Sequence, residues 1–336
     1  MTDSLLSIQT PVAHLLGPGK LAARGNRLAF SSKGREPLRL DPHRLEVLCC
    51  YGRIGVSDRA MELLLAAGVQ IAWMTRGGTR CRGRTVPENG STTPTRLAQY
   101  HYLSDPQRAL AFARAQVEAK LDSQLEAARH YQRQGRRPAR ATLRTLRRVR
   151  SSLPKARTLP ALRGHEGSAT AAWFKLFGKL LKRPWTFEKR TYRPPRDPVN
   201  ALLSLGYTWL TGRAAAQLAA LGLESRLGAL HDYRPGRPSL ACDTIEPFRL
   251  PTVDRWVLTL CNEGHLTPAD FRDDDQGTRL QPGTFARVVS SWEEHLAEGD
   301  WLTRLRSSIE TIASRFRDHS AYPPTTPPER PSGEGG

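Results

Sequence analysis

The sequence predicts an α+β protein in which a small β-rich N-terminal domain precedes a larger all-helical domain. Three observations support this prediction. Short apolar segments separated by turn residues fill the first 90 residues, a helical hydrophobic period begins near residue 95, and the last residues are rich in Pro, Gly and Thr. We therefore expect domains at 1–90 and 91–318, and a disordered tail at 319–336.

The N-terminal domain contains several apolar segments short enough to be strands. Gly25-Asn26 separates two of them and is typical of a two-residue hairpin turn. Ser57 is a favourable N-cap for a short helix, which Gly68 would end. The predicted strands span residues 12–16, 21–23, 28–30, 38–40, 45–50 and 69–74.

Beyond a Pro- and Gly-containing linker at 87–94, the predicted elements are helices. Asp105-Pro106 supplies an N-cap followed by proline at the first helical position of a long helix. The helix expected at 199–221 is mostly apolar, which predicts a central position. Further helices are expected at 139–153, 158–181, 252–261 and 285–316, the last broken at Gly299.

The composition narrows the classes of function. The chain has 51 Lys and Arg against 32 Asp and Glu, a net charge of +19, which points to nucleic acid or, second, to an anionic membrane surface. No apolar run is long enough to cross a membrane, and the first residues lack a signal-peptide pattern. The five cysteines form no CxxC pair, which argues against a disulfide framework and favours a cytoplasmic location.

The positive charge is concentrated in two stretches. Residues 129–157 contain eleven Lys and Arg and no acid, and residues 175–196 contain eight with one acid. A generally basic surface would spread its charge more evenly, so a nucleic-acid-binding surface is favoured over a solvated one. The phosphate-contacting residues predicted within these stretches are Arg140, Arg144, Arg147, Arg148, Lys175, Lys179 and Lys182.

A single acid, Glu166, lies between the two basic stretches. His165-Glu166 begins like the zinc motif HExxH, but residue 169 is alanine, which excludes that motif. The aspartates at 273–275 read as a solvated acidic loop rather than a cation site.

A second group of candidate residues follows a Pro- and Gly-rich loop. Asp243 and Glu246 are three residues apart and share a face of a helical turn, and the loop can bring His231 back to that turn. One imidazole and two carboxylates suit a hard divalent cation such as Mg²⁺ or Mn²⁺. Isolated residues of these types are more often structural, so both interpretations stay open on this pattern alone.

Several short motifs occur in order over about residues 12–317. They include Leu162-Arg-Gly-His-Glu-Gly167, Leu230-His231 and Glu246-Pro-Phe-Arg249, and the others lie at 52–58, 119–124, 197–204 and 236–241. Together, with their spacing, they resemble the CRISPR-associated adaptation integrase, the larger core endonuclease of spacer acquisition. One departure is Thr211, where many relatives carry tyrosine, and Tyr207 lies one turn earlier.

The resemblance implies a site and a reaction. Glu166, His231 and Glu246 would bind one divalent metal, Mg²⁺ or Mn²⁺, with Asp243 as a second acid nearby, and these four residues would form the catalytic site of the helical domain. The reaction would be metal-dependent phosphoryl transfer, in which a 3′-OH attacks a phosphodiester of a recipient duplex and inserts new spacer DNA into the repeat array. Water in place of the 3′-OH would give nuclease activity.

The resemblance also implies partners. These are double-stranded and branched DNA, a second copy of the chain in a homodimer built through the N-terminal domain, and the small second core protein of CRISPR adaptation, around which two dimers would assemble. No membrane partner is expected. Two alternatives stay open: a non-catalytic DNA- or RNA-binding protein that uses the same basic surface, and a basic structural protein with neither role.

Overall fold

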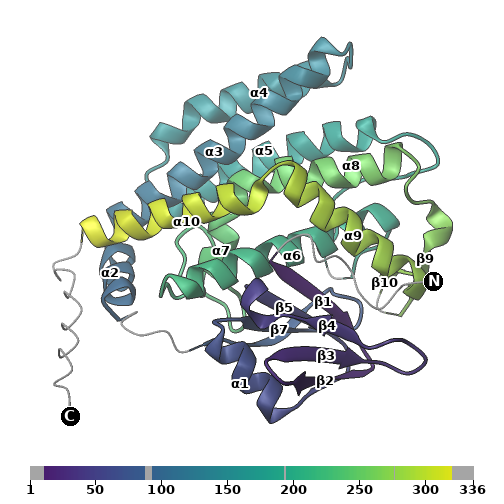
Figure 1. Cartoon of the computed structure of the whole chain (residues 1–336). Helices are drawn as coiled ribbons and strands as arrows, with labels where there is room; N and C mark the ends of the chain where they lie inside the picture. Colours follow the sequence, from purple (N-terminus) through teal and green to yellow (C-terminus); the bar gives the residue numbers. More distant parts are fainter. Residues whose placement is uncertain (1–10, 88–92, 193, 276, 320–336) are drawn as a thin grey trace.

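Two four-stranded sheets form the N-terminal region of the computed structural model, which describes residues 11–87, 93–192, 194–275 and 277–319 (Figure 1). The first sheet has the order β1-β5-β7-β8, parallel except for the pair β7–β8. Its strands are β1 (Val12–Leu16), β5 (Val47–Tyr51), β7 (Gln70–Met74) and β8 (Cys81–Thr85). The second has the order β4-β3-β2-β6, from β2 (Gly19–Arg24), β3 (Arg27–Ser31), β4 (Leu38–Leu40) and β6 (Ile54–Val56).

Strand β5 belongs to two hydrophobic cores. Successive side chains of a strand point to opposite faces of the sheet. Leu48 and Cys50 therefore pack between the two sheets and against helix α1 (Asp58–Ala66), whereas Cys49 and Tyr51 join the larger core formed with the helices. The N-terminal region thus shares a packed interface with the rest of the chain.

The remainder of the described chain is mainly helical, and helix α6 lies at its centre. Fifteen of the 23 residues of α6 are buried, because it packs between the sheet and the other helices (Figure 1). The helices are α2 (Thr93–Ser104), α3 (Pro106–Arg133), α4 (Ala139–Ser152), α5 (Leu159–Leu180), α6 (Pro198–Ala220), α7 (Ser239–Thr244), α8 (Arg255–Asn262), α9 (Pro282–Glu298) and α10 (Trp301–Asp318).

Local sequence signals set several helix ends. Asp105 accepts the backbone N–H groups of Gln107 and Arg108 at the start of α3, and Ser57 caps α1 through the N–H of Ala60. Both predicted caps are confirmed. Helices α9 and α10 separate near the predicted break at Gly299, where Asp300 has a positive φ of 50°.

The prediction of an all-helical second domain is wrong at one place. Strands β9 (Phe271–Asp274) and β10 (Gly277–Leu280) form an antiparallel hairpin, so part of the predicted acidic loop is a strand. The sequence did not predict this strand, because the three consecutive aspartates lack the alternation of apolar and polar residues that is typical of strands. The turn is favoured by Gly277, with a φ of 94°, and by the hydroxyl of Thr278, which donates to Asp273 at 2.6 Å. The predicted tail from residue 320 and most of the predicted linker, 88–92, lie outside the described residues.

A buried polar cluster joins the two regions. His14 of β1 lies 2.9 Å from a carboxylate oxygen of Glu293 in α9 and 2.9 Å from the hydroxyl of Tyr51 in β5. Arg213 of α6 forms an ion pair with the same carboxylate. Burial lowers the pKa of His14, so this ring is neutral near pH 7 and the charge pairing falls to Arg213 and Glu293.

In the part of the chain that the structure describes, no helix is both long enough and apolar enough to cross a bilayer.

Candidate active site

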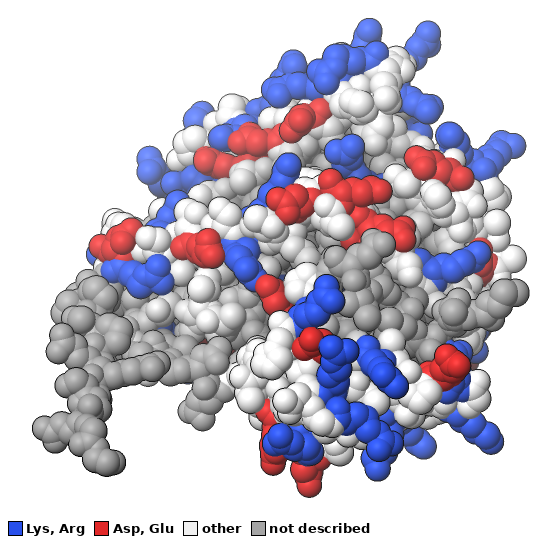
Figure 2. Space-filling view, viewed as in Figure 1, with Lys and Arg blue, Asp and Glu red and all other residues white. Residues whose placement is uncertain are grey.

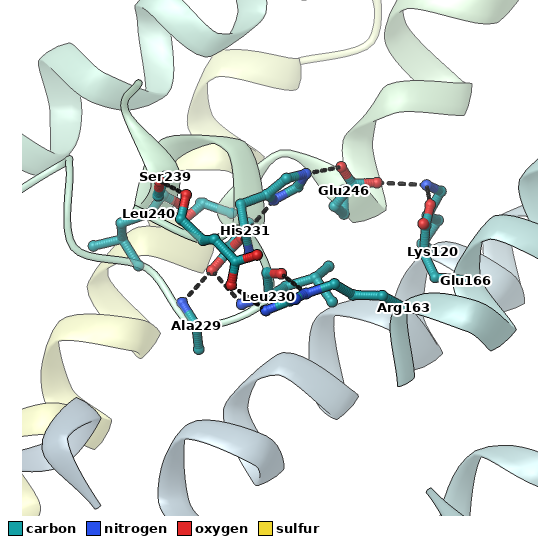
Figure 3. Close-up of polar contacts among 12 residues, drawn as sticks. Lys120, Arg163, Glu166, Ala229, Leu230, His231, Ser239, Leu240 and Glu246 are labelled. Atoms are coloured by element: carbon teal, nitrogen blue, oxygen red, sulfur yellow. Dashed lines mark hydrogen bonds and ion pairs between the residues drawn. The ribbon is translucent and has the colours of Figure 1, made fainter. Parts of the chain in front are cut away.

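Two carboxylates from distant parts of the chain converge on one lysine (Figure 3). Lys120 lies on α3, Glu166 on α5, and Glu246 begins a 3₁₀ turn, η3 (Glu246–Phe248). The ammonium of Lys120 donates to Oε1 of Glu166 and lies 2.6 Å from Oε2 of Glu246. The side chains of Lys120 and Glu246 are 6% and 1% exposed, and that of Glu166 is 23% exposed, so the group opens to solvent at Glu166.

The electrostatics keep this buried group ionised. Burial alone would lower the pKa of Lys120, but the carboxylates of Glu246 and Glu166 outweigh it and hold that pKa above its ordinary value. Burial would likewise raise the pKa of Glu246, yet the charges of Arg249, Lys120 and His231 bring it well below its usual range. The site therefore holds an ionised carboxylate in a largely dry environment.

His231 is held by Asp243 in a fixed orientation. Nδ1 of the ring lies 2.6 Å from Oδ1 of Asp243, and Nε2 lies 3.8 Å from Oε1 of Glu246. Asp243 is fully buried, and it also accepts the backbone N–H groups of Ala229, Leu230 and His231 at 2.7, 3.0 and 3.0 Å. One carboxylate thus fixes both the loop and the ring, which leaves Nε2 facing Glu246.

Gly228 permits this close approach of the loop to Asp243. A Cβ atom at residue 228 would lie 2.6 Å from Oδ2 of Asp243 and 2.7 Å from the backbone of Ser239. The loop could not then bring its N–H groups to the carboxylate.

Two arginines support the site from either side. Arg249 donates to Oε1 of Glu246 at 2.9 Å, and its guanidinium lies 4.1 Å from the ring centre of Tyr207 on α6. Arg163, one turn before Glu166 on α5, donates to the backbone carbonyl of Leu230 at 2.7 Å. These contacts tie Glu246 to α6 and the His231 loop to α5.

Tyr207 is the tyrosine nearest in the sequence to the departure at Thr211. Its hydroxyl donates to Asp254, a buried residue of the π-helical segment η4 (Arg249–Asp254), and burial holds the pKa of Tyr207 well above its ordinary value. The hydroxyl of Thr211 donates to the backbone carbonyl of Tyr207 at 2.7 Å. Tyr207 therefore acts on the site through the cation of Arg249.

The side chains that could hold a metal are Glu166, His231 and Glu246. They suit a hard divalent cation, because Oε2 of Glu246 is buried and already faces a cation, the ammonium of Lys120, and Nδ1 of His231 is held by a carboxylate. Among the described residues, however, no three His, Cys, Asp or Glu side chains lie close enough to hold a metal ion as they stand. Lys120 lies between the two glutamates.

The structure places the predicted phosphate-contacting residues differently in the two basic stretches. Arg140, Arg144, Arg147 and Arg148 are exposed on α4, whose opposite face packs through buried leucines, and basic side chains line the top edge of Figure 2, where Figure 1 shows this helix.

Lys175 and Lys179 are exposed on α5, whereas Lys182 lies beyond the end of that helix and does not continue its face. Helix α5 ends at Leu180, two residues earlier, and the backbone N–H of Lys182 donates to Asn262 at 2.8 Å. Pro184 disfavours a longer helix here.

The structure brings the four predicted residues Glu166, His231, Asp243 and Glu246 into one region, together with Lys120, Arg163 and Arg249, which the sequence did not single out. A signal for Lys120 was present. Residues 116, 120 and 124 are Gln, Lys and Gln, and they recur every four residues beside the apolar positions of Val117 and Leu121. A lysine at such a position is buried, and a buried lysine needs an acidic partner.

The sequence was compared with protein families and with proteins of known function. The family described as CRISPR associated protein Cas1 matches residues 13–294. CRISPR-associated endonuclease Cas1 3 of Thermus thermophilus is 34% identical over 282 residues, which cover 83% of this chain and 82% of the relative.

Solved structures share the fold. A Cas1 protein from Thermotoga maritima superposes with a TM-score of 0.81 at 21% identity and covers 91% of this chain and 96% of its own. A casposase bound to integration product gives 0.77 at 21% identity, with coverage of 95% and 93%. A chain of a Cas6-RT-Cas1–Cas2 complex gives 0.80 at 22% identity, covering 95% of this chain and 36% of that one.

These superpositions confirm the α+β fold class. The family match covers most of the chain and includes Glu166, His231, Asp243 and Glu246. It confirms the resemblance found in the sequence, and the protein belongs to the CRISPR-associated Cas1 family.

Proposed function

We propose that the protein is a divalent-metal-dependent DNA endonuclease and integrase of CRISPR adaptation. In its main reaction, a strand 3′-OH attacks a phosphodiester of a recipient duplex. A new P–O bond joins the spacer DNA to the repeat array, the bond from phosphorus to the 3′ oxygen of the recipient strand breaks, and that oxygen leaves as a 3′-OH after taking up a proton. The observation that carries the proposal is the convergence of Glu166, Glu246 and the Asp243-held His231 in a chain of the Cas1 family.

The proposed cofactor is Mg²⁺ or Mn²⁺, held by Glu166, His231 and Glu246. When bound, such an ion stabilises negative charge on the reacting phosphate. The residues of the chain orient the ligands: Asp243 fixes the ring of His231, and Arg249 engages Oε1 of Glu246 and leaves Oε2 directed toward the site.

The test of this function is strand joining of a duplex with 3′-OH ends into supercoiled plasmid. The wild-type protein should join strands in Mg²⁺ or Mn²⁺ and lose the activity in EDTA. DNA binding that is unaffected by EDTA, with no joining or cleavage under any condition, would support the alternative of a non-catalytic DNA- or RNA-binding protein.

Asp243→Asn should reduce strand joining by about 10- to 100-fold, the usual effect of removing a carboxylate behind a metal-binding histidine. The amide also puts an NH₂ group toward backbone N–H donors of residues 229–231, so we expect a loss of unfolding free energy of about 1–3 kcal/mol. Joining rates and urea denaturation measure the two effects.

Asp232→Asn is the matched control for this substitution. Asp232 neighbours His231 and pairs with Arg163, but its side chain is 61% exposed. This variant should stay close to wild type in both measurements. An Asp243→Asn protein that joins strands as fast as Asp232→Asn would contradict the positioning role.

Helix α4 is proposed to bind DNA phosphates. Replacing Arg140, Arg144, Arg147 and Arg148 together by glutamine should weaken DNA binding and reduce the slope of log K against log salt by about 0.9 for each phosphate that the protein no longer neutralises. The matched control replaces four exposed arginines of the N-terminal region, Arg24, Arg27, Arg35 and Arg39, with the same loss of charge. Equal salt slopes in the two variants, measured by fluorescence anisotropy, would exclude a specific role for α4.

The proposed partners are double-stranded and branched DNA, a second copy of the chain, and Cas2. The solved casposase is bound to an integration product, and a related chain occurs in a complex that contains Cas2, which supports the DNA and Cas2 parts. Two homodimers, each joined through the N-terminal sheets, would assemble around Cas2. Light scattering of the chain alone and with Cas2 tests both assemblies.

A further inference from the structure

Lys120 lies where a cation between the two glutamates would lie. Its ammonium contacts Glu166 and Glu246 at once, at the right of Figure 3. An ammonium and a divalent cation are attracted to the same carboxylate oxygens, so they compete for them. Oε2 of Glu246 lies 2.6 Å from this ammonium, so a second cation can reach that oxygen only if the ammonium withdraws.

The two cations that touch Glu246 differ in how firmly they are held. Arg249 engages Oε1 of Glu246 and also packs over the ring of Tyr207, so its guanidinium is fixed from two sides. Lys120 is a compact charge on a flexible chain of four methylene groups, and rotation of that chain can withdraw it without moving α3. Lys120 is therefore the exchangeable cation of the pair.

We propose that Lys120 is an internal counter-ion that a divalent metal displaces. In the metal-free protein it neutralises Glu166 and Glu246 and keeps them together. Metal binding releases the ammonium from both carboxylates, and the need to displace it limits the affinity of the site for metal. This inference rests on the proposed function, because it concerns the same carboxylates.

The test measures Mn²⁺ binding to the full chain without DNA, by electron paramagnetic resonance of the free ion. Lys120→Met removes the charge but keeps a flexible side chain, and it should lower the dissociation constant for Mn²⁺ at least about tenfold, the lower end of the coupling between close charges. Lys33→Met, at an exposed turn, removes the same charge and should bind Mn²⁺ as wild type does. Lys120→Met that binds Mn²⁺ with wild-type or lower affinity overturns the proposal.

Thermal unfolding gives a second measurement on the same variants. In EDTA, Lys120→Met should unfold at a lower temperature than wild type, because the buried carboxylate of Glu246 no longer has this counter-ion. Saturating Mn²⁺ should raise its unfolding temperature by more than it raises that of wild type. An equal rise in the two proteins counts against displacement.

Wild-type protein provides a measurement that does not depend on the folding of Lys120→Met. The ¹⁵Nζ resonance of Lys120, assigned by its disappearance in Lys120→Arg, should shift and exchange faster with water when Mg²⁺ is added. An unchanged resonance at saturating Mg²⁺ overturns the proposal.

Strand joining by the wild-type protein distinguishes a failure of the proposed function from a failure of the proposed displacement of Lys120. If wild type neither binds Mn²⁺ nor joins strands, the proposed function and the displacement both fail. If it does both while Lys120→Met gains no affinity, only the displacement fails.

Discussion

Glu166→Gln is expected to reduce strand joining by about 10³-fold while the protein stays folded. The substitution keeps the shape of the side chain and removes the charge of a carboxylate that faces Lys120 and, in the proposed reaction, the metal. Glu166 is part-exposed and its Oε1 accepts a bond from Thr170 at 2.8 Å, which an amide oxygen can also accept. The measurement is the initial rate of joining at saturating Mn²⁺, with urea denaturation to verify folding.

Glu126→Gln is the matched control, because Glu126 is an exposed residue of α3 and the substitution removes the same charge. It should join strands at the wild-type rate. Wild-type activity in Glu166→Gln would remove Glu166 from the reaction and leave the convergence of α3, α5 and η3 as a structural ion pair.

Glu293→Ala is expected to give the largest loss of stability, about 3–5 kcal/mol of unfolding free energy. The substitution leaves the buried guanidinium of Arg213 without its carboxylate, and breaking one partner of a buried pair has an effect of this size. Because the ring of His14 in β1 also bonds to this carboxylate, the interface between the sheets and the helices should open first. Urea denaturation monitored by tryptophan fluorescence measures the loss, and Trp292 is the adjacent probe.

The control for this prediction is Glu294→Ala, the next residue on α9, which is exposed. Its effect should be below about 0.5 kcal/mol. Similar losses in the two variants would show that the polar cluster does not hold the two regions together.

The sequence predicted the elements whose signals are local. Ser57, Asp105-Pro106 and Gly299 mark helix ends through backbone chemistry that depends on adjacent residues only. The hairpin β9–β10 was not predicted, because its two strands are short and polar. They are stabilised by pairing with each other, and neither segment alone has a pattern that predicts this pairing.

The candidate site shows the same division. His231, Asp243 and Glu246 could be grouped because they are close in the sequence, and Glu166 joined them through the resemblance. Lys120 is 46 residues from Glu166 and comes to the site only through the packing of α3 on α5 and η3. Helical periodicity can predict that Lys120 is buried, but it cannot predict which carboxylates the lysine contacts.

The length of α3 has a consequence for how far along a duplex the protein could reach. The helix continues for thirteen residues from Lys120 to Arg133, and α4 returns beside it with the arginines at 140–148. At about 1.5 Å per residue this is about 20 Å, or about six base pairs of DNA at 3.4 Å each. Six base pairs are little more than half a helical turn of DNA. A straight duplex that leaves the carboxylates along α3 and α4 therefore faces these two helices with one side only. Flanking DNA beyond that footprint should add no further contact with α4.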